Sequence, residues 1–295
     1  MVEQLTKMQN PRIGNASIKV VGVGGGGQNA VNRMYRERVE GVDYIAVNTD
    51  AQALKSAHLP EEHKLRVGDE TARGLGVGGD PSKGKQCHEE NREQIKKLLT
   101  GADLVFVAAG MGGGTGTGGS PVVAEIAQEL NCLTVGVITK PFNFEGQVRS
   151  KKAMEGIEQL SQHVDTMVVI PNDRLMAVSD ENLTMTGAFE MADDVLAQGV
   201  QSIAELILIP GEINLDFADV RAVMENAGPA WMAIGKGTGE DRAVKAAEEA
   251  INSPLLEVEI TGAKGVIFNI TGGSDLTLEE VQKASEVISS TVHPD

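Results

Sequence analysis

Two buried-strand sequences that run straight into glycine-rich turns constrain the fold of this chain most. The run "LVFVAA" (104–109) leads into "GMGGGTGTGGSP" (110–121), which holds seven glycines in twelve residues. The run "SIKVVGVG" (17–24) leads into "GGGQNAV" in the same way. Ordering glycine costs more backbone entropy than ordering any other residue, so such runs are typical of places where something approaches the main chain closely. The pattern predicts ligand-binding turns between strands and helices.

The first 170 residues alternate short apolar runs with helical patterns. Near-continuous apolar runs are typical of strands covered on both faces, and repeated strand–helix–strand units predict a doubly wound parallel α/β sheet. Ligands bind such sheets at the carboxyl ends of the strands. We expect strands at 17–24, 43–48, 102–109, 133–139 and 166–171, and helices at 28–39, 89–100, 119–131 and 146–163.

A long helix is expected next, at about 186–209, because its apolar residues recur every three or four positions, as in a buried amphipathic helix. A smaller second α/β region follows, and Trp231 at its start is expected to be structural. In this region we expect strands at 229–237 and 264–273 and helices at 240–251 and 277–290. The chain is therefore expected to divide into a sheet domain at 13–185, a central helix at 186–209 and a second domain at 210–295.

Charge and composition exclude several classes of protein. The chain carries 26 Lys and Arg against 42 Asp and Glu, a net charge of −16, and aromatic residues make up 3%. Such an acidic chain without a basic run repels nucleic acid and anionic membranes, and it lacks the aromatic platforms of single-strand binders. No segment approaches the run of about 18 apolar residues that a membrane span needs. We expect a cytoplasmic protein that neither binds nucleic acid nor inserts into membranes.

The cysteines and histidines show no disulfide or metal-ligand spacing. Two cysteines are too few for a disulfide framework or a zinc cluster, and Cys132 is expected in the core. The histidines are scattered and are all expected at the surface: His58, His63, His88, His163 and His293.

The glycine turns leave three interpretations open. Gly22, Gly24 and Gly27 fit the G-x-G-x-x-G spacing of dinucleotide sites, so an NAD-dependent oxidoreductase is one alternative. A second turn at 112–119 and a third, "RGLGVGGDPSKG" (73–84), favour a longer polyphosphate held from several sides by main-chain N–H groups. A tight turn without any ligand is the third alternative, and the Lys-anchored P-loop pattern is absent.

Six further segments carry a family resemblance. The stretch "GGGTGTG" at 112–118 resembles the signature of the tubulin superfamily. Together, "VVGVGGGGQNAVNRM", "VNTDAQAL", "GLGVGGDP", "TKPFNFEG", "IPNDRL" and "INLDFADV" resemble the FtsZ family of bacterial cell-division GTPases over about residues 13–293. The resemblance implies hydrolysis of GTP to GDP and phosphate, head-to-tail filaments, and a cytokinetic ring at mid-cell. It also implies division-ring regulators and membrane tethers as partners of the full-length protein. A tubulin-like scaffold that binds GTP but hydrolyses it poorly is a further alternative.

The resemblance assigns the GTP phosphates to the first two glycine turns. Main-chain N–H groups at helix N-termini suit a polyphosphate. Mg²⁺ is expected with the triphosphate, held mainly by phosphate oxygens and water, with no metal ligand expected from the protein. Gln28 stands where the family usually has Asn, and its longer amide can still donate. The matching residues are Gly25, Gly26, Gly27, Gln28 and Asn29 in the first turn and Gly114, Thr115 and Gly116 in the second.

The resemblance also assigns the ribose and the base. Glu145 and Arg149 match the ribose contacts, and their i, i+4 spacing equally fits an ordinary surface ion pair. Asn172, Phe189 and Asp193 match the base site. A carboxylate accepts from N1–H and the exocyclic amine of guanine but would face the acceptor N1 of adenine, which favours GTP over ATP. The alternatives are a core position for Phe189 and a solvated helix face for Asp193.

The catalytic residues implied by the family lie in the segment "NLDFADV", supplied by a neighbouring subunit. They are Asn214, Asp216 and Asp219, of which the two acids would position and polarise the attacking water. By itself this spacing fits an N-cap and a first-turn acid of a helix equally well.

The family's second domain normally continues beyond residue 295, followed by a linker and a tail that binds membrane tethers. We therefore expect this chain to lack strands of its second sheet, to be less stable than the longer protein, and to be unable to bind partners of the tail.

Overall fold

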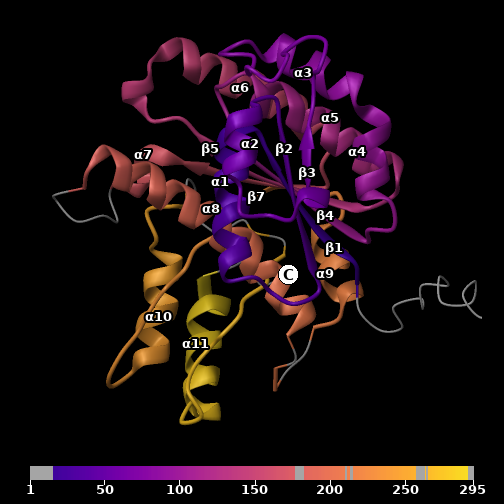
Figure 1. Cartoon of the computed structure of the whole chain (residues 1–295). Coiled ribbons are helices and arrows are strands. Elements are labelled where there is room, and N and C mark those ends of the chain that lie inside the picture. The colour runs from indigo at the N-terminus through magenta and orange to yellow at the C-terminus, as the bar shows by residue number, and fades with distance from the viewer. Residues whose placement is uncertain are drawn as a thin grey trace, which may run out of the picture.

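The computed structural model describes residues 16–176, 183–209, 211–212, 215–256, 263 and 265–291. Within these residues, seven strands form one sheet in the order β3-β2-β1-β4-β5-β6-β7 (Figure 1). Each neighbouring pair is parallel, which confirms the doubly wound α/β class. The strands are β1 (Ile18–Val23), β2 (Val42–Asn48), β3 (Lys64–Arg66), β4 (Leu104–Gly110), β5 (Leu133–Lys140), β6 (Thr166–Pro171) and β7 (Gly228–Ala230).

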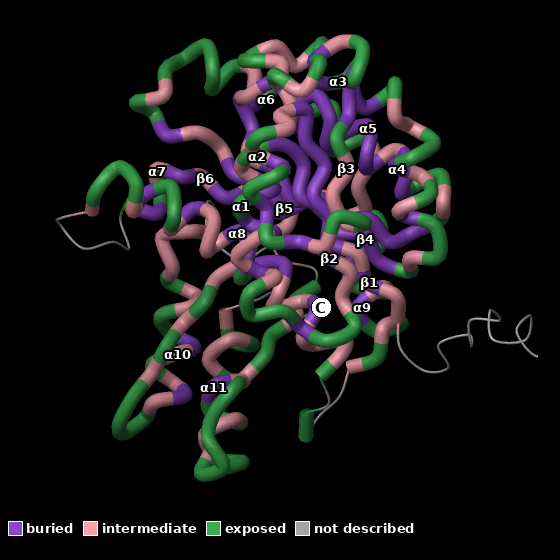
Figure 2. The backbone as a smooth tube through the Cα atoms, in the orientation of Figure 1, coloured by how far each residue is buried: buried purple, intermediate pink, exposed green. Residues whose placement is uncertain are grey.

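Helices cover both faces of this sheet, and the strands between them are the most deeply buried part of the chain (Figure 2). One hydrophobic core joins the sheet to α1 (Gly24–Arg36), α2 (Ala51–Ser56), α7 (Asn172–Leu175), α8 (Met185–Leu208) and α9 (Phe217–Met224). The second core joins the opposite face to α3 (Pro81–Glu90), α4 (Arg92–Leu99), α5 (Thr115–Glu129) and α6 (Gln147–Ser161).

The five strands expected from apolar runs form within two residues of their expected bounds. The long helix also forms as expected. Helix α8 buries Ala192, Leu196 and Val200 against the sheet, and this is the stripe that the periodicity predicted. Cys132 is buried, as expected.

The second region differs from the expectation. The strand expected at 229–237 is reduced to β7, which pairs with β6 and so extends the main sheet. No strand forms among the described residues of 264–273. An apolar run becomes a strand only where a neighbouring strand supplies hydrogen-bond partners, and β6 offers such partners to three residues. Trp231, expected to be structural, is 43% exposed.

Two helices of this region form as expected and pack side by side (Figure 1). They are α10 (Arg242–Ile251) and α11 (Leu278–Thr291). Their shared core is small: Ala243, Ala247 and Ala284 are buried, with Ile270, Val287 and Ile288 packed against them.

The expectation that all histidines lie at the surface is wrong for one of them. His88 is fully buried, and its Nδ1 lies 2.7 Å from the carbonyl oxygen of Gly84. A Cβ on Gly119 would lie 2.1 Å from His88 Cε1, so the imidazole occupies space that a glycine of α5 leaves free. Burial lowers the pKa of His88 to about 4. His58 is exposed and His63 and His163 are half-buried, whereas His293 lies outside the described residues.

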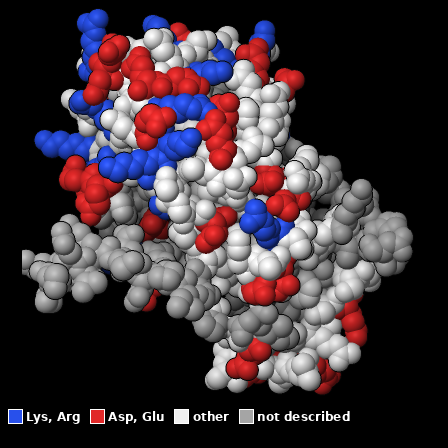
Figure 3. Space-filling view, turned by 90° about the vertical axis from the view of Figure 1, so that its right-hand side faces the viewer, with Lys and Arg blue, Asp and Glu red and all other residues white. Residues whose placement is uncertain are grey.

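Charges of both signs are interleaved on the face that carries α3 and α4 (Figure 3). Arg92, for example, forms ion pairs with Glu89, Glu125 and Glu129, which tie α4 to α5. This face carries no patch of a single sign in the view of Figure 3.

Candidate nucleotide site

The first two glycine turns meet at the carboxyl ends of β1 and β4. Strand β1 ends at Val23, and α1 begins directly at Gly24. Gly24 has a φ of +70°, and a Cβ there would lie 2.7 Å from the backbone nitrogen of Gly116. The first turns of α1 and α5 therefore contact each other, so that two helix N-termini with free N–H groups face one region. Such a pair of N-termini favours an anion.

The glycines of the first turn differ in what they contact. A Cβ on Gly27 would lie 2.1 Å from the carbonyl oxygen of Ala108, so Gly27 is needed for α1 to pack on β4. A Cβ on Gly26 would lie 3.3 Å from the Cα of Gly110. Gly25 is exposed and has no atom within 4 Å of a built Cβ. The space over Gly25 is therefore where a ligand can approach the backbone.

The second turn is held by the third. A Cβ on Gly114 would lie 2.4 Å from the carbonyl oxygen of Gly78, and one on Gly84 would lie 2.2 Å from that of Gly114. Thr115, which begins α5, shares a hydrogen bond of 2.7 Å between its Oγ1 and that of Thr49. These contacts fix the backbone of the second turn before any ligand is present.

Gln28 has a structural role in the fold. Its side chain is buried, its Nε2 donates to the carbonyl oxygen of Ala53 at 2.7 Å, and its Oε1 accepts from Asn48 Nδ2 at 2.8 Å. Both ends of the amide are thus bonded to protein groups of β2 and α2. A contact between Gln28 and a nucleotide stays a prediction.

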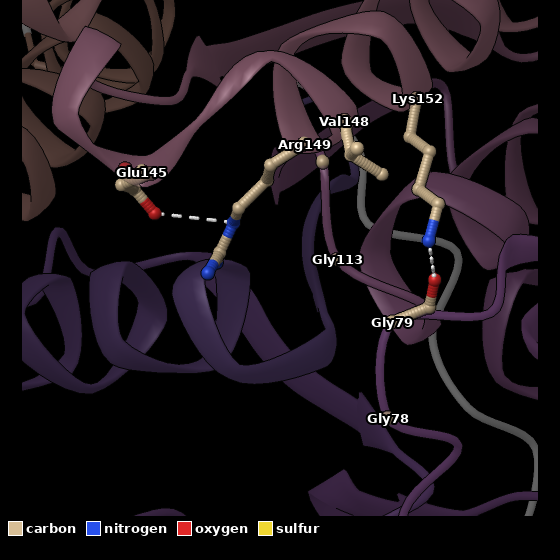
Figure 4. A pocket seen from close by; sticks show the side chains of 8 residues that line it. Gly78, Gly79, Gly113, Glu145, Val148, Arg149 and Lys152 are labelled. Atoms are coloured by element: carbon tan, nitrogen blue, oxygen red, sulfur yellow. Dashed lines mark hydrogen bonds and ion pairs between the residues drawn. The ribbon is translucent and has the colours of Figure 1, made fainter.

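The candidate ribose residues line a cavity of about 320 Å³ (Figure 4). Glu145 and Arg149 form an ion pair at 3.1 Å, and the Glu145 side chain is largely buried. Glu145 also accepts a 2.8 Å hydrogen bond from the backbone nitrogen of Phe142. The cavity is lined by Gly78, Gly79, Gly112, Gly113, Glu145, Val148, Arg149 and Lys152.

Aromatic rings gather around Phe189. Phe142 and Phe144 stack on each other with centroids 5.0 Å apart, and the Phe189 ring meets the Phe142 ring edge to face at 5.5 Å. Phe142 is buried, whereas Phe144 and Phe189 are exposed. Phe189 therefore sits at the edge of the core with ring surface that is open to a ligand.

Polar groups of the candidate base site are only partly satisfied. Asn172 is buried, and its Oδ1 has no hydrogen-bond partner among the described residues. Burial raises the pKa of the Asp193 carboxyl to about 7, although Arg33 and a hydrogen bond with the Asn29 side chain act in the opposite direction. The bond to Asn29 links the base site to the first glycine turn. A ligand that donates hydrogen bonds would satisfy both groups.

The candidate catalytic acids lie far from these turns. Asp216 is the N-cap of α9, where its Oδ1 accepts from the Asp219 backbone nitrogen at 2.9 Å and Asp219 Oδ2 accepts in return at 3.1 Å. The last residue of α9, Met224, accepts a hydrogen bond from Thr166, which starts β6. Helix α9, which carries the acids at its start, thus packs at the amino edge of the sheet (Figure 1), whereas the glycine turns lie at its carboxyl edge. Asn214 lies outside the described residues.

Lys152 was missed by the reasoning from sequence. Its ammonium donates to the carbonyl oxygen of Gly79 in the third turn, across the cavity (Figure 4). Nothing in its local sequence distinguishes it from Lys151, and the signal that could have identified it is its spacing of three residues from Arg149, on the same helix face.

Two models of known protein families match this chain. A family model described as "Tubulin/FtsZ family, GTPase domain" matches residues 17–180, and one described as "FtsZ family, C-terminal domain" matches 228–295. A solved FtsZ W319Y mutant of M. jannaschii is 45% identical with a TM-score of 0.91, and the alignment covers 100% of this chain and 86% of that one.

Two other solved structures extend the comparison. An empty FtsZ dimer of M. jannaschii is 46% identical with a TM-score of 0.91, covering 99% of this chain and 84% of that one. The GDP-bound CetZ1 monomer of Haloferax volcanii shares the fold, with a TM-score of 0.77 at 20% identity, over 94% of this chain and 88% of that one. The matched models and the two relatives of 45% and 46% identity show that the chain belongs to the Tubulin/FtsZ family of GTPases.

Proposed function

We propose that this protein binds GTP at the carboxyl edge of its sheet and assembles head to tail into filaments, in which the next copy completes the hydrolytic site. In this assignment the first two glycine turns, through Gly25 and Thr115 among others, hold the phosphates. Glu145 and Arg149 hold the ribose. Asn172, Phe189 and Asp193 hold the guanine, and Asn214, Asp216 and Asp219 act on the phosphates of the neighbouring copy.

The observation that supports this proposal is that the sheet separates Asp216 and Asp219 from the candidate nucleotide residues. Strand β6 alone has six residues, and at about 3.3 Å per residue it spans roughly 20 Å. Acids at its amino end cannot reach a nucleotide at its carboxyl end. A second copy, stacked so that its amino edge faces this carboxyl edge, brings the two sets together. A contact between two different surfaces that does not close into a ring produces filaments.

The base site supports guanine. An ionised Asp193 accepts from the N1–H and the exocyclic amine of guanine, and Asn172 Oδ1, which has no partner in the described part of the chain, adds a second acceptor. Adenine offers an acceptor at N1, which would face the carboxylate and lose this pairing.

Mg²⁺ is part of the proposal as a companion of the triphosphate. No group of three or more His, Cys, Asp and Glu side chains in the described residues could hold a metal ion. We propose an ion that is bound by phosphate oxygens and water, which is the usual mode for Mg²⁺ with nucleotides. Bound there, the ion neutralises phosphate charge, and the chain's own amides orient the phosphates.

The domain bounds and the cellular role belong to the same proposal. We assign GTP binding to 13–185, the connection to the helix at 186–209, and the acid-bearing second domain to 210–295. In the cell the filaments would act in the cytoplasm as a division ring at mid-cell, with regulators and membrane tethers. No helix among the described residues is long and apolar enough to cross a membrane.

A mixing experiment tests the shared site. Asp219→Asn removes one catalytic charge but keeps an oxygen that can accept from the Asp216 nitrogen, so α9 stays capped. Gly25→Asp blocks the phosphate turn with a negative charge. Each variant alone should release little phosphate from GTP, whereas the mixture should release more than the sum of both, because one interface then combines both intact halves. Full turnover by Asp219→Asn alone would contradict the proposal.

The nucleotide itself is tested separately. Ligand extracted from the purified protein, or binding measured by calorimetry, should identify GTP or GDP. Recovery of NAD would favour the oxidoreductase alternative. GTP binding without any turnover in filaments would favour the scaffold alternative.

A further inference from the structure

Lys152 lies across the cavity that the candidate site residues line. It extends from α6 and is half-buried, and its ammonium donates to the carbonyl oxygen of Gly79 (Figure 4). Gly112 and Gly113, at the start of the second glycine turn, line the same cavity. Lys152 therefore bridges α6 and the third glycine turn at the point where the second turn is exposed to the cavity.

The charge of Lys152 is balanced differently from that of its neighbours. Arg149 is paired with Glu145 at 3.1 Å, and Lys151 lies near Glu155 at 3.9 Å on the exposed side of α6. The Lys152 ammonium has no carboxylate partner among the described residues, and its hydrogen bond goes to a neutral carbonyl. An ammonium has three donors, so two remain for other acceptors.

The position of Lys152 along the helix selects which part of a nucleotide it can reach. It lies three residues beyond Arg149, which is roughly 4.5 Å further along the helix axis. Arg149 is the candidate ribose residue, and Lys152 is displaced from it toward Gly79 and the third turn. Gly79 follows Gly78, whose carbonyl oxygen packs against Gly114 of the second turn, and the second turn is the candidate phosphate site. Lys152 is therefore on the phosphate side of Arg149.

We propose that Lys152 binds the terminal phosphate oxygens of GTP while it keeps its hydrogen bond to Gly79. This inference rests on the proposed function, because it takes the ligand of the cavity to be a guanosine polyphosphate. The ammonium then ties residues 73–80 to the phosphate farthest from the sugar. The third turn is held more firmly when a triphosphate is bound than when a diphosphate is bound.

Paired variants at neighbouring lysines test this role. Lys152→Met keeps an apolar stem of similar length and removes the charge, and Lys151→Met is the matched control on the exposed side of the same turn. Affinities for GTP and GDP are measured by calorimetry at fixed Mg²⁺ and ionic strength. We expect Lys152→Met to lower the affinity for GTP about tenfold and that for GDP less than threefold, whereas Lys151→Met changes neither affinity.

A second readout follows the third turn directly. Hydrogen exchange of the amides in 73–80 should slow when a slowly hydrolysed GTP analogue is added to the unchanged protein, and should slow less in Lys152→Met. Lys152→Arg, which keeps the charge, should restore most of the difference between the affinities for GTP and GDP. Thermal unfolding without nucleotide shows that each variant is folded.

The outcomes separate the two proposals. If the unchanged protein does not bind GTP, both the proposed function and the role of Lys152 are overturned. The role of Lys152 alone is overturned if the unchanged protein binds GTP and Lys152→Met binds it equally well. It is also overturned if Lys152→Met lowers the affinities for GTP and GDP by the same factor.

Discussion

The carboxyl and amino edges of the central sheet are built in opposite ways. At the carboxyl edge, glycine backbones are packed so closely that built Cβ atoms on Gly114 and Gly118 would lie 2.4 Å and 1.9 Å from carbonyl oxygens. At the amino edge, the exposed acids Asp216 and Asp219 are held mainly by each other at the start of α9. The first edge has a fixed backbone, whereas the second presents side chains on a short helix.

This difference suits the two edges to different tasks, ligand binding at the carboxyl edge and contact with another molecule at the amino edge. Backbone amides that are fixed before a ligand arrives need no reorganisation when it binds, which favours tight binding of a charged group. Among the described residues, the acids are hydrogen-bonded to each other rather than to a glycine-packed backbone. The region that follows them has a small core of Ala243, Ala247 and Ala284, in contrast to the two large cores of the sheet. This difference is what the proposed shared site requires, with a binding half formed within one chain and an acidic half supplied by a neighbouring copy.

The largest expected effect comes from breaking the close packing at the carboxyl edge. In Gly118→Ala the new Cβ would lie 1.9 Å from the carbonyl oxygen of Pro81, the first residue of α3, which is backbone and cannot rotate away. We expect a loss of about 3 kcal/mol in the free energy of unfolding, at the upper end for overpacking. Chemical denaturation without nucleotide measures this loss.

Gly113→Ala is the matched control for this change. Gly113 lies five residues earlier and has nothing within 4 Å of a built Cβ. Its free energy of unfolding should change by less than about 0.5 kcal/mol. Equal unfolding midpoints for the two variants would show that the carboxyl edge is not rigidly packed.

The next effect separates binding from folding at the same edge. In Gly25→Asp the side chain enters open space, and an acid in the first turn of α1 is favourable for the helix. The unfolding temperature without ligand should therefore be maintained or raised. GTP affinity should fall about 100-fold, or about 2.7 kcal/mol, because the carboxylate faces the phosphates.

Gly25→Asn is the control, with the same shape and no charge. It should lower the affinity for GTP much less than Gly25→Asp does. Equal affinities for the Asp variant and the unchanged protein would place the phosphates elsewhere.

A smaller effect depends on pH and tests the base site. The folded pKa of Asp193 is about 7, above its ordinary value of 3.8. A raised carboxyl pKa stabilises the fold in the protonated form, and this contribution is fully present below pH 3.8 and is lost as the pH rises through 7. Guanine requires the ionised form, so GTP affinity should fall about tenfold per pH unit below 7. Calorimetry between pH 5.5 and about 8 measures this slope.

Asp193→Asn removes this titration and controls for protonation of the nucleotide itself. Its GTP affinity should vary less with pH than that of the unchanged protein. Without nucleotide it should be more stable than the unchanged protein above pH 7, and this advantage should shrink toward pH 4. Parallel pH profiles for the two proteins would remove Asp193 from the base site.

Much of the fold could be predicted because the buried strands carry local signals. Strands β1, β2, β4, β5 and β6 are continuous apolar runs, and α8 carries a clear stripe. Strand β3, with the sequence "KLR", was missed because it has three residues, two of them charged, and exists by pairing with β2. The strand expected at 229–237 is shortened to β7, and none forms among the described residues of 264–273, because apolar sequence alone does not supply a pairing partner.

The candidate site was predictable where backbone chemistry leaves a sequence pattern. Glycine runs after strands indicated the turns, but they did not separate Gly25, which is open, from Gly27, which packs against Ala108. Lys152 and the buried His88 depend on contacts with segments far away in sequence. Such contacts leave no local pattern, so they required the structure.

The smallest expected effect tests the independence of the amino edge. Asp216→Ala removes the acceptor for the Asp219 nitrogen and should cost about 1 kcal/mol of stability, whereas Asp216→Asn should cost a few tenths. The loss appears in global unfolding because Val220 of α9 is fully buried in the main core. Neither variant should change GTP affinity at protein concentrations too low for assembly, since the acids lie at the far edge of the sheet. A change in that affinity of more than about twofold, beyond the usual scatter for distant sites, would mean that the two edges communicate within a single chain.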